Sequence, residues 1–81
     1  MNKYKPLEEY LYTQNCPQVT LAFEQIEEIL GFPLPFVAKT ERHWWSNTIS
    51  DSNSQAIAWL KAFCRVSHVK PGELVTFIKV S

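Results

Sequence analysis

The 81-residue sequence lacks the features that define several large protein classes. It contains no apolar run of membrane-spanning length and no pattern of a secretory signal peptide, so we expect no membrane association. Its two cysteines, Cys16 and Cys64, fit no metal-ligand spacing. Free thiols are the default in a reducing compartment. We therefore predict a single domain over residues 1–81 in the cytoplasm, or in the host cytoplasm if a phage encodes it.

Residues that usually build catalytic sites are also scarce. With only Gly31 and Gly72, the chain has no glycine-rich loop to cradle phosphates. If Cys64 and His68 lie on one strand, they are about 13 Å apart at ~3.3 Å per residue, too far for a nucleophile and its base. There is no paired-carboxylate motif and no metal-ligand cluster. We predict a protein that is not an enzyme and that needs no metal or cofactor.

Positive charge is missing from a long stretch in the first half of the chain. No Lys or Arg occurs from Leu7 to Ala38, while five glutamates do. From Lys39 onward six cations face three acids, and the formal net charge of the whole chain is zero. Duplex DNA binding draws much of its affinity from phosphate neutralisation, so this balance disfavours DNA as a partner. It remains compatible with a small ligand that carries two or three phosphates.

Aromatic residues are abundant, at 14% of the chain. A domain of this size buries only roughly 60–65% of its unfolded surface, and large aromatic side chains compensate for a small core. Self-association would bury more apolar area, so we predict a homo-oligomer, most simply a two-fold one. The edge of the C-terminal hairpin or the tryptophan region is the expected contact.

The apolar periodicity predicts a small α+β domain. A helix is expected over residues 6–12, a short strand over 18–22, and a helix from Ala22 or Phe23 that ends at Gly31. Residues 36–45 suggest a further helix, residues 46–53 a loop, and residues 54–63 the clearest helix. Two strands, 64–70 and 74–80, follow around the Pro71-Gly72 turn. The order helix, strand, helix, one or two helices and β-hairpin is winged-helix-like.

Three of these segments carry detailed expectations. In residues 36–45 the apolar face should hold Phe36, Val37, Thr40 and Trp44. In residues 54–63 it should hold Ala56, Ile57, Leu60 and Phe63, with Trp59 at its edge and a cap from Asp51, Ser52 or Asn53. Residues 64–70 alternate strictly, as a half-buried strand does. The shared core is predicted to contain Phe23, Ile26, Leu30, Ile57, Leu60, Val66, Val75 and Phe77.

The segment from Arg42 to Asn47 is the best candidate for a functional site. Adjacent tryptophans diverge on any regular backbone, so one of Trp44 and Trp45 is expected at a surface. In one interpretation that ring is a platform for a planar anionic ligand, with an arginine fork on phosphate. In the other, Trp44 is core and Trp45 is a half-buried cover. The candidate ligand-binding residues are Arg42, His43, Trp44, Trp45, Asn47, Trp59 and Arg65.

Four stretches together resemble a family of small, functionally uncharacterised bacterial and phage domains. They are residues 19–31, Leu34-Pro35, Arg42-x-Trp44-Trp45-x-Asn47, and Ala58-Trp59-Leu60-x-Ala62. The resemblance covers nearly the whole chain, and the Arg-x-Trp-Trp-x-Asn element is its most specific part. The family pattern has Gly-Trp after the alanine matching Ala62, where this chain has Phe63-Cys64. That pattern also has Thr before the phenylalanine that matches Phe23, where this chain has Ala22. The resemblance implies no established activity.

Three functional hypotheses follow from these features. The leading one is a non-catalytic binding protein for a nucleotide-type small molecule, such as a phage sponge that sequesters a host immune nucleotide signal. The second is a winged-helix-like DNA-binding or regulatory module, which the element order favours and the neutral charge disfavours. The third is a protein-interaction module that uses an exposed tryptophan as its main contact.

Overall fold

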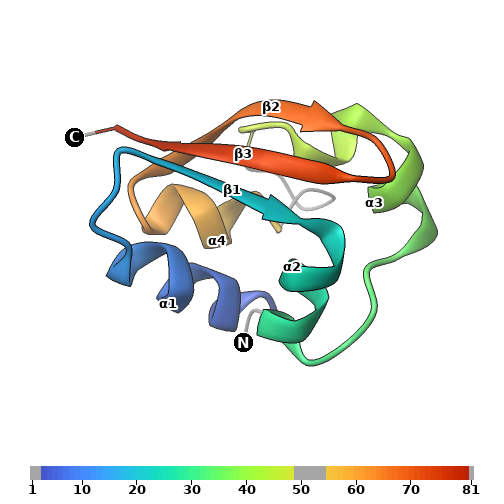
Figure 1. Cartoon of the computed structure of the whole chain (residues 1–81), viewed down its shortest axis with the longest axis horizontal. Helices are drawn as coiled ribbons and strands as arrows, with labels where there is room; N and C mark the ends of the chain where they lie inside the picture. The colour runs from blue at the N-terminus through green and yellow to red at the C-terminus, as the bar shows by residue number, and fades with distance from the viewer. Residues whose placement is uncertain (1–2, 49–54, 81) are drawn as a thin grey trace.

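The computed structural model describes residues 3–48 and 55–80, and these form one α+β domain. The elements run α1 (Lys5–Thr13), β1 (Gln18–Ala22), α2 (Phe23–Leu30), α3 (Phe36–Thr40), the 3₁₀ helix η1 (Arg42–Trp45), α4 (Ala56–Lys61), β2 (Cys64–Lys70) and β3 (Leu74–Lys79). The strands form an antiparallel sheet in the order β1-β3-β2, with α1, α2 and α4 below it (Figure 1). This confirms the predicted α+β class.

The elements of the first half begin and end where the sequence predicts. Pro6 stands in the first turn of α1, where its missing N–H is not needed. Gly31 ends α2 in the left-handed conformation, with φ of 82°. In a residue with a side chain this conformation is disfavoured, so glycine is the natural choice there.

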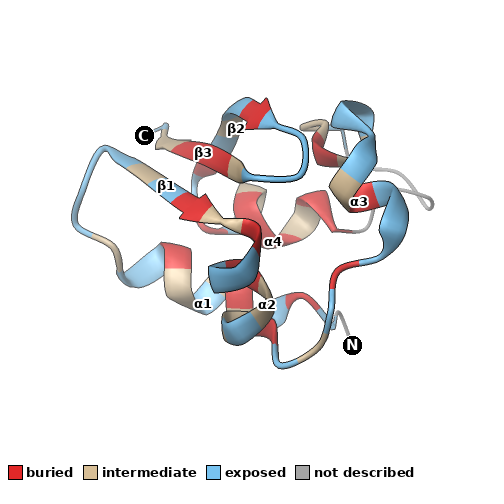
Figure 2. Cartoon of the chain, turned by 45° about the vertical axis from the view of Figure 1, so that its right-hand side comes forward, coloured by how far each residue is buried: buried red, intermediate tan, exposed pale blue. Residues whose placement is uncertain are grey.

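The helices cover one face of the sheet (Figure 1). Leu21, Val75 and Phe77 share one face of the sheet and are almost fully buried. Figure 2 shows much of β3 as buried. On the other face Thr20 lies opposite Thr76, and their hydroxyl oxygens are 3.0 Å apart. The predicted core residues Phe23, Ile26, Leu30, Val75 and Phe77 are buried. Leu60 and Val66 are only partly buried against the same cluster, and Ile57 is partly buried.

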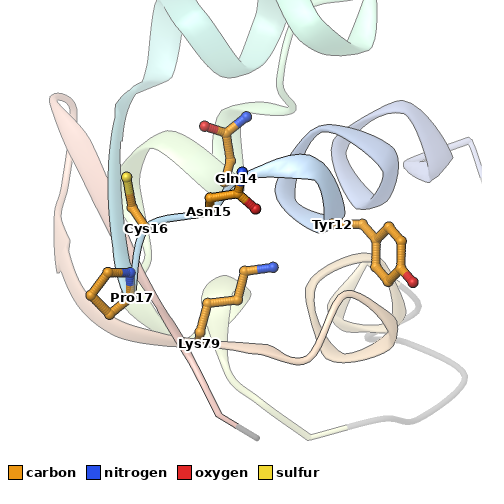
Figure 3. A pocket seen from close by; sticks show the side chains of 6 residues that line it. All are labelled: Tyr12, Gln14, Asn15, Cys16, Pro17 and Lys79. Carbon is orange, nitrogen blue, oxygen red and sulfur yellow. The ribbon is translucent and has the colours of Figure 1, made fainter.

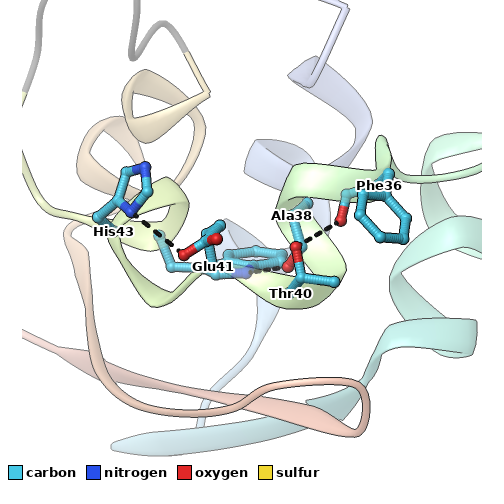
Figure 4. Close-up of polar contacts among 6 residues, drawn as sticks. Phe36, Ala38, Thr40, Glu41 and His43 are labelled. Carbon is cyan, nitrogen blue, oxygen red and sulfur yellow. Dashed lines mark hydrogen bonds and ion pairs between the residues drawn. The ribbon is translucent and has the colours of Figure 1, made fainter.

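The prediction of one continuous helix over residues 36–45 is wrong, because the segment is divided into two short helices. Glu41 is extended, with φ of −119° and ψ of 120°, and separates α3 from η1. Because of this break, Ala38 rather than Phe36 faces the core, and Phe36 is 81% exposed. The break also redirects the second segment, so that Trp45 enters the core and its Nε1 donates to the carbonyl of Ala38 at 2.8 Å (Figure 4).

Helix α4 also departs from its prediction. Its buried residues are Ala56, Ala58 and Trp59, followed by Ala62 after its last turn, so Trp59 lies at the centre of the packed face and not at its edge. Phe63, predicted on the apolar face of this helix, is instead 59% exposed. The helix ends at Lys61, and Phe63 takes a positive φ of 60°, which turns its side chain away from the apolar face. The expected caps, Asp51, Ser52 and Asn53, lie outside the described residues.

The C-terminal hairpin has the turn expected from Pro71-Gly72. Gly72 has φ of 80°, and the N–H of Glu73 donates to the carbonyl of Lys70 at 2.9 Å, as in a type II turn. The strict alternation predicted for β2 is wrong at one point. The register with β3 shifts between Val66 and His68, so that Ser67 is an extra residue in the strand.

Candidate functional site

Asn47 joins three elements at the end of η1. Its Nδ2 donates to the carbonyl of Val66 at 3.1 Å, and its Oδ1 accepts from the Val66 N–H at 2.9 Å. The same Oδ1 accepts from Nε1 of Trp59 at 3.0 Å. One amide thus ties the η1 segment to both β2 and α4. These contacts fix the position of the neighbouring Arg42–Trp45 turn relative to the sheet.

The bulge in β2 changes the surface next to this junction. With one extra residue between Val66 and His68, both Ser67 and His68 are exposed in succession, and the buried side of the strand resumes at Val69. The Ser67 hydroxyl lies 3.4 Å from the carbonyl oxygen of Thr76. Bulges commonly redirect side chains beside binding sites.

A hollow of about 300 Å³ lies between η1 and the bulged edge of β2. Its lining consists of Arg42, Trp45, Ser46, Asn47, Val66, Ser67, His68 and Val69. Among the described residues, no carboxylate comes within ion-pair distance of Arg42. The lining itself combines the guanidinium of Arg42 and the imidazole of His68 with serine hydroxyls. Such a set of groups suits an anionic ligand.

Backbone groups of the strand also face this hollow. The side chain of Asn47 takes both the N–H and the C=O of Val66, so these groups point to the outer edge of β2. Beyond the bulge, His68 and Lys70 occupy the positions whose backbone groups point toward β3, since the Lys70 carbonyl accepts from Glu73 in the turn. The N–H and C=O of Val69, between them, therefore point outward. Val69 lines the hollow, so its N–H is a further donor on that side.

The predicted aromatic platform is wrong for Trp45 and Trp59. Trp45 is 2% exposed and Trp59 fully buried. The Trp45 ring is stacked between Phe23, at 5.6 Å between centroids and 28°, and Trp59, at 5.7 Å and 27°. Both of its faces are covered, so no base can stack on it. The sequence alone could not show this, because the break at Glu41 decides which tryptophan turns inward.

Trp44 is the partly exposed member of the pair, the reverse of the structural interpretation drawn from the sequence. Its ring meets Trp45 edge-on at 4.7 Å and Tyr4 edge-on at 5.8 Å. Tyr4 is itself buried, and its burial raises the pKa of its hydroxyl above the ordinary value. Trp44 therefore covers the N-terminal end of the core and does not line the hollow.

The structure brings only part of the predicted site together. Arg42, Trp45 and Asn47 line the hollow, and Trp59 lies beneath it, bonded to Asn47. His43 lies outside, with Nδ1 at 3.9 Å from a carboxylate oxygen of Glu41 (Figure 4). Arg65 is exposed on β2 but does not line the hollow. The amide of Asn47, expected to read a base edge, is instead engaged in the three structural bonds.

Sequence reasoning missed the contribution of β2 to this site. Ser46, Val66, Ser67, His68 and Val69 complete the lining. Strict alternation along the strand gives no reason to place His68 in a binding site. The bulge that exposes it has no clear marker in the sequence, since neither glycine nor proline stands near Ser67.

A second hollow, of about 430 Å³, lies at the opposite end of the sheet (Figure 3). Tyr12, Gln14, Asn15, Cys16, Pro17 and Lys79 line it. Lys79 lies in its centre, with Nζ 6.0 Å from the ring centroid of Tyr12. Cys16 is an exposed free thiol, whereas Cys64 is free and buried, and this burial raises the pKa of the Cys64 thiol.

Comparison with known proteins adds the family. Residues 4–81 match the family described as "Domain of unknown function (DUF7662)". The chain belongs to this family. No curated protein and no solved structure matches the chain. The DUF7662 match covers nearly the whole sequence, as the expected resemblance to a small uncharacterised domain family did.

In residues 3–48 and 55–80, no helix is long and apolar enough to cross a membrane. In the same part of the chain, no three His, Cys, Asp or Glu side chains gather closely enough to hold a metal ion.

Proposed function

We propose that this DUF7662 domain is a non-catalytic binding protein for a small nucleotide-type ligand. The observation that supports this best is the hollow between η1 and β2, where Arg42 and His68 converge on a surface without a lining carboxylate. This hollow overlaps only part of the site expected from the sequence. It contains Arg42, the expected phosphate-binding residue, and it has the bulged edge of β2 in place of the expected tryptophan platform.

The chemistry of the lining favours an anionic group. The planar guanidinium of Arg42 can hold two phosphate oxygens at once. The Val69 N–H is a neutral donor on the opposite wall, and the imidazole of His68 adds a further hydrogen-bonding group. A volume of about 300 Å³ lies at the lower end of the range for small-molecule pockets, roughly 300–1,000 Å³. It suits a mononucleotide or the phosphate-bearing part of a larger nucleotide.

The wall of the hollow is preorganised for binding. Because Asn47 fixes Val66, and Trp45 is packed between two aromatic rings, Arg42 rises from a turn that cannot shift easily. Binding to a rigid site loses less conformational freedom than binding to a mobile one. Tight binding without turnover would suit sequestration of a nucleotide signal in the cytoplasm, the role considered from the sequence.

The test is a thermal-shift screen followed by calorimetry. The ligands are mononucleotides, cyclic dinucleotides, ADP-ribose and inorganic phosphate, and the variants are Arg42→Lys and Arg65→Lys. Lysine keeps the charge but not the fork, so Arg42→Lys should weaken binding about tenfold or more, equivalent to roughly 1.5–3 kcal/mol. Arg65→Lys, on β2 but outside the hollow, is the control and should bind as the wild type does. Equal affinity of Arg42→Lys and wild type, or no binding of any of these ligands, would refute the proposal.

A winged-helix-like DNA-binding module remains the second candidate. What favours it is the antiparallel strand order β1-β3-β2, which places the β2–β3 hairpin as a wing after the helices. Arg65 and Lys70 are exposed on that hairpin, although Lys70 pairs with Glu73 at 3.0 Å. Titration with a short DNA duplex at several salt concentrations distinguishes the two. A DNA module should lose affinity steeply with salt and with either arginine changed.

A further inference from the structure

The two edges of the sheet are built differently. The edge of β2 carries several features that prevent pairing with another strand: the bulge at Ser67, the charged side chains of Arg65 and Lys70, and the Asn47 amide that occupies both edge groups of Val66. The predicted contact of two copies through this hairpin edge is therefore disfavoured.

The edge of β1 has neither a bulge nor a charged side chain. The strand reads Gln18-Val19-Thr20-Leu21-Ala22, with no charged residue and no proline, and its register with β3 is unbroken over all five residues. An unprotected edge strand is a ready template for pairing with another strand. Strand β1 lies at the rim of the sheet, with β3 on its other side (Figure 1).

The hydrogen-bond pattern shows which groups face this edge. The N–H of Lys79 donates to the carbonyl of Pro17, and the N–H of Phe23 donates to the carbonyl of Glu73. In an antiparallel ladder the bonded residues alternate, so Val19 and Leu21 also bond to β3. The backbone groups of Gln18, Thr20 and Ala22 therefore point outward. Of these, the Ala22 N–H is capped by Oε1 of Gln25 at 2.8 Å.

We propose that β1 pairs antiparallel with β1 of a second copy of this chain, so that the two sheets join into one of six strands. In the register that sets Gln18 against Thr20 of the second copy, both residues offer an N–H and a C=O in each chain. The two-fold axis then passes beside Val19, and four hydrogen bonds satisfy all eight groups. No charge is buried and none opposes another.

The cap on Ala22 selects this register. A pairing centred on Thr20 would place Ala22 opposite Gln18, and its N–H would have to leave Gln25 to bond across the interface. The register centred on Val19 leaves the cap in place. It also sets the two Val19 side chains, each half-buried against its own core, side by side across the axis. This self-complementarity is what singles out a second copy from other extended chains.

This dimer leaves the ligand site free. Strand β2 and the hollow beside η1 lie at the other edge of the sheet, so each copy presents its hollow at one end of the six-stranded sheet. The dimer and the proposed binding function can therefore fail independently of one another.

The first test is light scattering on the wild type and on Thr20→Pro. Proline removes the outward N–H of residue 20, which the β1–β3 ladder does not use. The wild type should be a dimer at high micromolar concentration, and Thr20→Pro should be a monomer with an unchanged circular dichroism spectrum. Thr20→Val keeps the N–H but loses the hydroxyl contact with Thr76, so it is the matched control and should remain a dimer. A monomeric wild type, or a dimer that survives in folded Thr20→Pro, would overturn the proposal.

The second test does not depend on the folding of the proline variant. In a Cys16→Ser background, Val19→Cys places two thiols at a non-hydrogen-bonded pair, where the Cα atoms are about 4.5 Å apart and within disulfide range. The Val19→Cys protein should oxidise to a covalent dimer. Over the same time a Leu21→Cys control should stay monomeric, because Leu21 is buried. Thr20→Cys reports the alternative register. Faster cross-linking of Thr20→Cys than of Val19→Cys, or none in either, would refute the register proposed.

Discussion

The side chain of Asn47 bonds to both backbone groups of Val66, as a neighbouring strand would. An amide presents one donor and one acceptor in a plane, the same pair that a peptide unit presents, so it can occupy the edge of β2 without forming a strand. The contact connects the Arg42–Trp45 turn to the sheet, and the bond from Trp59 to the same oxygen adds the helix beneath. Asn47 is thus a structural residue whose position determines the shape of the hollow.

The first prediction follows from these three bonds. Asn47→Ala removes all of them and leaves the Nε1–H of buried Trp59 without its acceptor, so we expect a loss of about 2–4 kcal/mol in the free energy of unfolding. Asn47→Asp keeps the acceptor for Trp59 and for the Val66 N–H, and it should lose less. Urea denaturation of the three proteins measures this. If Asn47→Ala unfolds at the wild-type urea midpoint, the amide is not the connection that its geometry indicates.

The second prediction concerns Trp45, whose ring fills the space between Phe23 and Trp59. Trp45→Ala should lower the free energy of unfolding by about 3–5 kcal/mol, which is a large part of the stability of a small domain. Trp45→Phe keeps an aromatic ring in the stack but leaves the carbonyl of Ala38 without the indole donor, so it should cost less. Trp44→Ala, at the half-buried neighbour, is the control and should be the mildest of the three.

Thermal unfolding followed by circular dichroism separates the three variants. A Trp45→Ala protein that melts like the wild type would show that the ring is not part of the core. That result would reopen the platform hypothesis drawn from the sequence.

Much of the fold can be predicted from the sequence because local signals are strong there. The proline in the first turn of α1, Gly31 after α2 and Pro71-Gly72 in the hairpin each mark a boundary that the structure confirms. The failures occur where tertiary packing decides the backbone. At Glu41 an extended residue breaks an apparent helix, and at Ser67 an extra residue interrupts an alternating strand.

The candidate site illustrates the same limit. Arg42 and Asn47 can be selected from residue type, because both are obvious hydrogen-bonding groups beside aromatics. The roles of these two residues cannot be deduced from residue type, since Asn47 has a backbone partner 19 positions away in the sequence. Glutamates that flank the apolar stripe of a helix, as in α2, normally form a solvated face. Glu27 departs from this, because its partners, Leu34 and Lys39, lie beyond the end of its own helix.

The third prediction uses the positive φ of Phe63. A residue with a Cβ atom loses roughly 1–2 kcal/mol in the left-handed conformation, whereas glycine does not. Glycine is also freer in the unfolded chain, which offsets part of this gain. We therefore expect Phe63→Gly to exceed Phe63→Ala by about 1 kcal/mol in the free energy of unfolding. The comparison excludes the loss of the ring, which both variants share.

Equal stability of these two variants in urea would show that position 63 relaxes out of its left-handed conformation. A Phe63→Gly variant more stable than Phe63→Ala would show that the end of α4 favours a residue without a side chain.

The fourth prediction concerns pH and Glu27. The N–H of Leu34 donates to its Oε2 at 2.8 Å, and Nζ of Lys39 lies 3.1 Å from the same oxygen. The hydrogen bond from Leu34, followed by that from Lys39, lowers the pKa of Glu27 below its ordinary value of 4.5. Because the folded state holds the carboxylate in its charged form, Glu27 stabilises the fold above the pKa of the unfolded chain. This contribution is lost as the pH falls through the lower pKa of the folded state.

Glu27→Gln tests this directly, because it resembles a carboxyl group that is always neutral. At pH 7 we expect the variant to be less stable than the wild type by about 1–2 kcal/mol, the contribution of a hydrogen bond to a charged acceptor. As the pH falls through the lowered pKa of the folded state, the two proteins should converge, since the wild type then loses its charge as well. Glu28→Gln, on the exposed side of the same helix, is the control and should differ little from the wild type at any pH. Urea midpoints measured from pH 3 to pH 7 give the result. A difference in midpoint between Glu27→Gln and wild type that stays constant over this range would contradict the prediction. It would show that the carboxylate charge does not hold α3 and its connector against α2.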